Sequence, residues 1–187
     1  MIAELRTERL KLRAIGVDDI SSFVPMLNDF DVAKNLAPVP FPYTDQDGRE
    51  FIVRTERSRA CGIVLNYAVL LWDETFIGFC TANIEDEGRR PGPGKRELGY
   101  WYGKSYWRCG YATEAARAVV VHAFETLGTD ALTSGWFVDN PASGRVLAKL
   151  GFVPAGKAER MCLSRGTTVM SNRVELTREA FAGTARR

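Results

Sequence analysis

A short stretch in the middle of the chain combines features that suit the binding of an anion. Residues 97–103 read as a strand rich in aromatic side chains, a polar loop follows and ends at Gly110, and a helical pattern then runs from Tyr111 to Gly128. Backbone N–H groups at a helix start have no partner within the helix, and the helix dipole makes that end positive. A phosphate there would meet several donors, so the sequence predicts a phosphate-binding junction.

Two common nucleotide-binding motifs do not fit these letters. Residues 99–105 come close to a nucleoside-triphosphate P-loop, but only three residues, all aromatic, separate Gly99 from Gly103, and the motif needs four. A dinucleotide fingerprint fails as well, because no third glycine follows Gly92 and Gly94 at the required position. The sequence therefore predicts neither a P-loop for a nucleoside triphosphate nor a dinucleotide-binding fingerprint at this junction.

Composition restricts the class of protein. The chain has 187 residues, of which 45% are hydrophobic, which is enough for one core and predicts a single domain over residues 1–187. The net charge of +2 is too small to argue for nucleic acid or an anionic membrane as a partner. Four cysteines without paired spacing and one histidine make a poor zinc set, so we expect no metal and a reduced, cytoplasmic setting. The longest apolar run, 62–72, is too short to span a bilayer.

The elements around the junction follow from hydrophobic periodicity and from turn residues. Strands are expected at 9–15, 62–72, 75–84, 97–103, 131–138, 152–153 and 167–176. Helices are expected from Asp18, and at 31–36, 45–59, 111–128 and 140–150, with an extended proline-rich segment at 37–42, a charged loop at 85–96 and a terminal turn at 177–181. This mixed order predicts an α+β fold, with helices packed on one mostly antiparallel sheet.

Several short stretches together resemble one known family. They lie at 7–13, 97–101, 110–115, 140–143 and 150–152. In this order and spacing they resemble the GNAT acetyltransferases, in the branch that contains the RimJ/RimL ribosomal-protein N-acetyltransferases. The resemblance covers nearly the whole chain and implies the GNAT fold, a mostly antiparallel, twisted and splayed sheet of about seven strands flanked by helices. It also implies transfer of an acetyl group from acetyl-CoA, as co-substrate, to an amine.

The family holds the cofactor pyrophosphate in a loop of pattern Gln/Arg-x-x-Gly-x-Gly/Ala. Here the pattern falls on Trp107, Arg108, Cys109, Gly110, Tyr111 and Ala112. Gly110 and Ala112 match, and Trp107 replaces Gln or Arg as is usual in this branch. Arg108 and Cys109, however, stand where the branch tends to have Gly and then Lys or Arg. Loss of that glycine restricts how the backbone turns toward the phosphates, and the Arg108 guanidinium either binds a phosphate oxygen or lies in solvent.

The resemblance also implies roles for residues near the loop. Glu97 is the candidate general base, with an ordinary surface salt bridge as the alternative. Ser143 is expected to protonate the leaving thiolate. Asn140 is expected to bind the pantetheine amide, with a simple helix cap as the alternative. The remaining cofactor-binding residues are Tyr100, Trp101 and Tyr102, lining the acetyl site, Thr113 at the helix start, and Arg145, reaching toward the phosphates.

Direct transfer without a covalent enzyme intermediate is expected. The single histidine, His122, lies midway along a predicted helix as a structural residue, and Cys109 has no catalytic partner in the sequence. The acceptor is a primary amine, either the α-amine of a protein N-terminus or a small molecule, and the loops 38–44 and 85–96 carry no readable specificity. A non-catalytic sensor of acetyl-CoA is the alternative function. We expect neither nucleic acid nor membrane as a partner, and a homodimer stays open.

Overall fold

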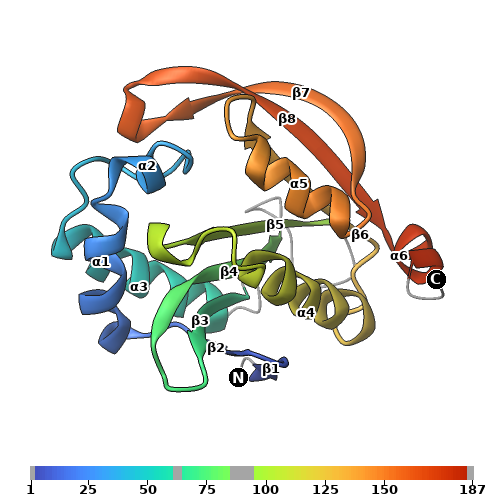
Figure 1. Cartoon of the computed structure of the whole chain (residues 1–187), viewed down its shortest axis with the longest axis horizontal. Helices are drawn as coiled ribbons and strands as arrows, with labels where there is room; N and C mark the ends of the chain where they lie inside the picture. Colours follow the sequence, from blue (N-terminus) through green and yellow to red (C-terminus); the bar gives the residue numbers. More distant parts are fainter. Residues whose placement is uncertain (1–2, 61–64, 85–94, 185–187) are drawn as a thin grey trace.

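A single curved sheet runs through the molecule (Figure 1). The computed structural model describes residues 3–60, 65–84 and 95–184. The strands are β1 (Leu5–Arg6), β2 (Leu10–Ala14), β3 (Asn66–Leu71), β4 (Phe76–Ile84), β5 (Lys95–Tyr102), β6 (Ala131–Phe137), β7 (Val153–Cys162) and β8 (Thr167–Thr177). In these described parts, the sheet has the strand order β1-β2-β3-β4-β5-β6-β8-β7, and β5 and β6 form its parallel pair.

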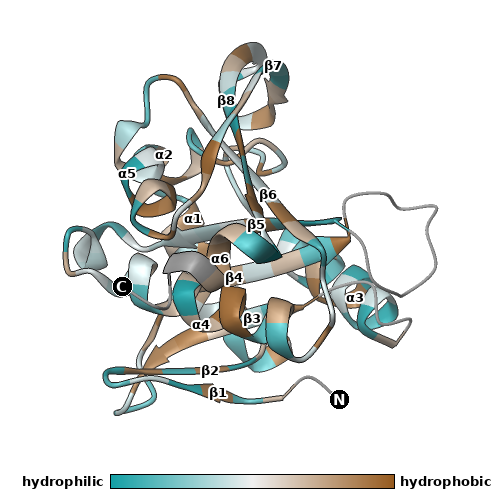
Figure 2. Ribbon diagram, turned by 90° about the vertical axis from the view of Figure 1, so that its right-hand side faces the viewer, coloured by the Kyte–Doolittle hydropathy of each residue, from teal (hydrophilic) through white to brown (hydrophobic). Residues whose placement is uncertain are grey.

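Helices cover both faces of the sheet. They are α1 (Ile20–Leu27), α2 (Phe30–Ala33), α3 (Asp45–Ala60), α4 (Tyr111–Glu125), α5 (Pro141–Lys149) and α6 (Arg178–Thr184), with short 3-10 turns η1 (Val17–Asp19), η2 (Lys104–Tyr106) and η3 (Leu163–Arg165). Figure 1 shows α1, α2 and α3 to one side of β4 and β5, and α4 and α5 to the other. Two apolar cores result, one beneath α4 and α5 and one beneath α1 and α3. Figure 2 shows hydrophobic residues concentrated where the helices meet the sheet.

The side chains of β5 alternate between these two cores, as successive residues of a strand must. Leu98 and Tyr102 are buried in the core beneath α4. Trp101 points to the opposite face, where its ring stacks on Phe79 at a centroid distance of 6.4 Å. The strand at the centre of the predicted junction therefore presents different residues to each side of the sheet.

The pairing between β5 and β6 is short. The two strands are in register from Lys95 opposite Ala131 to Glu97 opposite Thr133, and the ladder stops there although both strands continue. Beyond it, the Ser134 hydroxyl donates to the Leu98 carbonyl at 2.8 Å. From Leu98 to Tyr102, β5 therefore forms no ladder with β6. This is the splayed arrangement expected of a GNAT sheet.

The sequence predicted this mixed α and β architecture correctly, with three differences. The described chain has eight strands rather than about seven, because the two-residue strand β1 is too short to show a period. Strand β7 extends to Cys162 well beyond the expected 152–153, and the expected terminal turn is the helix α6. The expected loop at 85–96 and the start of the expected strand 62–72 fall largely outside the described residues.

None of the helices in the described parts of the chain combines the length and apolarity needed to cross a bilayer.

Candidate functional site

The loop between β5 and α4 has an unusual backbone conformation. The Trp107 indole Nε1 donates to the Tyr102 carbonyl at 2.7 Å and folds the loop back onto the end of β5. Arg108 has φ +63° and Gly110 has φ +84°, so both adopt the left-handed conformation. Glycine enters this region freely, whereas for arginine it costs about 1 to 2 kcal/mol. The loop therefore makes the turn that the missing glycine would have eased, at the expense of strain at Arg108.

The same loop presents a row of backbone donors that have no partner in the described parts of the chain. The N–H groups of Thr113 and Glu114 donate to the Gly110 carbonyl, both at 3.1 Å, and the Trp107 N–H donates to Lys104. Within the described residues, no acceptor is recorded for the N–H groups of residues 108–112. These groups stand at the positive end of a helix of 15 residues. This arrangement is suited to bind a phosphate or pyrophosphate.

A carboxylate in the first turn of α4 is neutralised from the N-terminal part of the chain. Glu114 accepts hydrogen bonds from the Thr7 hydroxyl at 2.6 Å and from the Arg9 backbone at 2.9 Å, and it forms an ion pair with the Arg9 guanidinium at 2.6 Å. Burial acts to raise the pKa of Glu114, but the bonds from Thr7 and Arg9 outweigh it, and the pKa is lowered. Sequence reasoning gave Arg9 no role, although it lies in one of the stretches that carry the family resemblance.

On the α4 face of the sheet, Tyr100 of β5 reaches Ser143 of α5. The phenol oxygen of Tyr100 lies 3.0 Å from the Ser143 carbonyl oxygen and 3.0 Å from Ser143 Oγ. Burial raises the pKa of Tyr100, so its phenol stays protonated and can donate. Ser143 in turn donates its backbone N–H to Asn140 Oδ1 at 3.4 Å, which makes Asn140 the N-cap of α5. The three residues bring together β5 and α5.

Helix α5 can lie this close to the sheet because of one glycine. A Cβ at Gly144 would meet the Trp136 ring of β6 at 2.6 Å, a separation that real contacts essentially never show. A larger residue at this position would require either the Trp136 ring or α5, which carries Ser143, to shift. Arg145 lies exposed one residue further along the helix.

Glu97 occupies the other face of β5, together with Trp101. Its Oε1 atom accepts hydrogen bonds from Arg160 of β7 at 3.0 Å and from Arg173 of β8 at 3.2 Å. The carboxylate therefore lies in an ion-pair cluster that ties β5 to the last two strands. The side chains of the three aromatic residues expected to line one acetyl site do not lie together. Tyr100 contacts Ser143, Tyr102 is buried beneath α4, and Trp101 lies in the opposite core.

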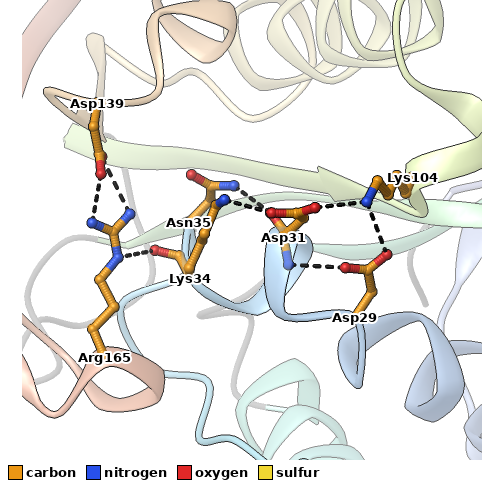
Figure 3. Close-up of polar contacts among 7 residues, drawn as sticks. All are labelled: Asp29, Asp31, Lys34, Asn35, Lys104, Asp139 and Arg165. Atoms are coloured by element: carbon orange, nitrogen blue, oxygen red, sulfur yellow. Dashed lines mark hydrogen bonds and ion pairs between the residues drawn. The ribbon is translucent and has the colours of Figure 1, made fainter.

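A polar network links this second face to the loop and to α5 (Figure 3). Lys104 in η2 bonds Asp31 at 2.6 Å, and with Lys34 it lowers the pKa of Asp31 to about 2. Arg165, in η3 between β7 and β8, pairs with Asp139 at 2.6 Å and donates to the Lys34 carbonyl at 2.7 Å. Segment 29–35 is thus joined both to the loop that precedes α4 and to the residue next to Asn140.

Neither a metal centre nor a cysteine–histidine pair is found in the described parts of the chain. No group of His, Cys, Asp and Glu there could hold a metal ion. Cys109 is exposed, with Sγ 3.4 Å from the Trp107 carbonyl, whereas His122 is buried in α4 and its pKa is lowered by that burial and by Arg96.

Comparisons with known proteins agree with this geometry. Residues 9–153 match the family model described as "Acetyltransferase (GNAT) domain". The chain is 31% identical over 153 residues to "Putative ribosomal N-acetyltransferase YdaF" of Bacillus subtilis (strain 168), covering 81% of each protein.

Two solved structures share the fold. The ribosomal-protein-S5-alanine acetyltransferase of Vibrio fischeri has a TM-score of 0.80 at 15% identity, over 95% of this chain and 97% of that one. RimL, described as a ribosomal L7/L12 alpha-N-protein acetyltransferase in complex with coenzyme A, has a TM-score of 0.79 at 18% identity, over 95% of this chain and 99% of that one.

Proposed function

Because the chain belongs to the GNAT acetyltransferase family, we propose that it transfers an acetyl group from acetyl-CoA directly to a primary amine. The observation that carries the proposal is the row of N–H groups at residues 108–112 that have no acceptor among the described residues, together with the edge of β5 that β6 does not pair and the Tyr100–Ser143 contact. A phosphate-bearing cofactor and a reacting thioester need these two features side by side.

The residues of the loop fit the cofactor. The N–H groups of residues 108–112 would hold the pyrophosphate, and the guanidinium of Arg108, within the same loop, would add charge. Arg145, exposed on α5, is proposed as a second source of positive charge. The Asn140 amide nitrogen and the part of β5 beyond its ladder with β6 would bind the pantetheine amides. The thioester supplies an acyl group that is already activated, so the protein has to position the amine, remove its proton and protonate the leaving sulfur.

Ser143 is proposed to protonate the thiolate. Its hydroxyl lies at the start of α5, and Tyr100, which stays neutral because burial raises its pKa, supplies a donor behind it. An acyl-cysteine route is not supported, because Cys109 is exposed on the loop and His122 is buried within α4. Transfer in one step is therefore the simpler chemistry.

Glu97 is proposed as the general base on the acceptor side. In the described residues both arginine contacts are made to Oε1, which leaves Oε2 to take a proton from the amine or from an intervening water. Glu97→Gln should then lower kcat/KM by about a hundredfold or more, most strongly below neutral pH. If the carboxylate serves only the ion-pair cluster, Arg160→Met, which removes one of its partners, will have an equal effect and no change in the pH profile will be seen.

A protein N-terminus is the acceptor favoured by the relatives, since YdaF and RimL carry ribosomal acetyltransferase names. A small amine is the second candidate. The test is thiol release from acetyl-CoA with a panel of small primary amines and of peptides with different N-terminal residues. Each peptide is paired with its N-acetylated form, in which the α-amine is blocked. Release that needs a free amine supports the transferase.

The alternative function is a module that binds acetyl-CoA without turnover. It would bind CoA in a calorimetric titration and release no thiol with any member of the panel. That result would overturn the transferase and leave the cofactor site intact.

A further inference from the structure

Arg9 contacts the phosphate-binding loop through several atoms at once. Its Nη1 donates to the Cys109 carbonyl at 3.1 Å, and its Nε donates to Glu114 Oε2 at 2.7 Å. The guanidinium also lies over the Tyr111 ring, 4.7 Å from its centroid. These partners stand about a hundred residues away in the sequence. One side chain therefore joins the loop, the first turn of α4 and the turn before β2.

The contact with Cys109 determines where the next N–H group points. A peptide bond is planar and trans, so the Cys109 carbonyl and the Gly110 N–H point in opposite directions. Because Arg9 holds the Cys109 carbonyl, the Gly110 N–H points to the opposite side of the peptide. There it belongs to the row of N–H groups at residues 108–112 that have no acceptor among the described residues. If this peptide flipped, a carbonyl dipole would replace a donor in the phosphate site.

The backbone on either side of this peptide makes such a flip easy without an anchor. Gly110 has no Cβ to restrict it, and Arg108 is held in a strained conformation at φ +63°. Strained residues persist only where their surroundings fix them. The described contacts of the loop that could do so include the Trp107 indole bond to Tyr102 and the Arg9 bond to Cys109.

Arg9 also balances charge at the helix start. Glu114 puts a carboxylate in the first turn of α4, where it competes with a bound anion for the same positive field. The Arg9 guanidinium pairs with this carboxylate at 2.6 Å. Removal of Arg9 would leave negative charge next to the site where the pyrophosphate is expected.

We propose that Arg9 is a positioning residue of the cofactor loop: it fixes the Cys109–Gly110 peptide with its N–H toward the pyrophosphate and neutralises Glu114. This rests on the proposed function only in taking the anion to be the pyrophosphate of CoA. The planar guanidinium is essential, because a lysine ammonium can pair with Glu114 but cannot reach Glu114 and Cys109 in the same geometry.

The test is the affinity for CoA, measured by calorimetry without an acceptor. Arg9→Lys is expected to keep the thermal stability near that of the wild type and to weaken CoA binding on the order of tenfold, and Arg9→Met to weaken it further. Arg13→Met is the matched control, because Arg13 forms a comparable bidentate pair with Asp19, at 2.7 and 2.8 Å, away from the loop. It should lower stability and leave CoA affinity unchanged.

A second probe locates the effect. Acetyl-pantetheine lacks the pyrophosphate, so its kcat/KM as an acetyl donor should be the same in Arg9→Lys and in the wild type, whereas that of acetyl-CoA falls. CoA affinity in Arg9→Lys within twofold of the wild type would overturn the proposal, as would an equal loss in Arg13→Met. A wild-type protein that binds CoA but acetylates no amine would refute the transferase and leave the role of Arg9 standing.

Discussion

Replacing Tyr100 with phenylalanine removes one oxygen atom and leaves the ring in place. That oxygen lies 3.0 Å from both the carbonyl oxygen and Oγ of Ser143. Without it, the serine hydroxyl can occupy any of three staggered positions, which reduces the reactive population by about threefold. If a hydrogen bond worth about 1.4 kcal/mol in the transition state is also lost, a further factor of about ten follows, and the decrease in kcat reaches about thirtyfold. KM for acetyl-CoA should change little.

The assay is initial-rate kinetics of Tyr100→Phe, Ser143→Ala and the double variant. If Tyr100 acts through Ser143, Tyr100→Phe should lower kcat much less in the Ser143→Ala background than in the wild type. Tyr102→Phe is the matched control, because its buried hydroxyl has no hydrogen-bond partner in the described part of the chain. Equal losses from Tyr100→Phe in both backgrounds, or a comparable loss in Tyr102→Phe, would refute the reasoning.

Three further predictions concern the loop and α4. Arg108→Gly should relieve the strain at φ +63° and raise the free energy of unfolding by up to about 1 kcal/mol in urea denaturation, and a decrease would show that the arginine side chain stabilises the turn. Cys109→Ala should keep full transferase activity, and loss of turnover would point to an acyl-cysteine intermediate. Burial lowers the pKa of His122, so the unfolded chain binds the proton more tightly and stability should be lost as the pH falls below about 6.5. His122→Gln should lose less stability over that range in denaturation experiments. Parallel curves of unfolding free energy against pH for the variant and the wild type would contradict this.

The elements around the site could be predicted because their signals are local. Gly110 before an apolar helical period sets the start of α4, and Asn140 followed by Pro141 sets the start of α5. The turn at Asp73–Glu74 between two apolar runs gives the β3–β4 hairpin. Strand β7 was underestimated because it lies at the edge of the sheet and is mostly exposed, so it lacks the alternation of apolar and polar residues that marks a half-buried strand.

The contacts that define the site could not be predicted in the same way. Tyr100 meets Ser143 across a separation of 43 residues, and Arg9 meets Glu114 across 105. Such pairs depend on strand order and register, which a single sequence does not contain. The left-handed conformation of Arg108 also runs against local preference, and only the surrounding contacts explain it.

The claim that the start of α4 holds acetyl-CoA has a direct test in a titration of the ¹⁵N-labelled protein with CoA, followed through backbone amide resonances. The largest shifts should fall on residues 108–112, whose N–H groups have no acceptor in the described structure, with smaller shifts at Asn140 and Ser143. The same titration with pantetheine should shift Asn140 and Ser143 and leave residues 108–112 unchanged. Shifts that saturate elsewhere while the amides of 108–112 stay in place would contradict the cofactor site proposed for this protein.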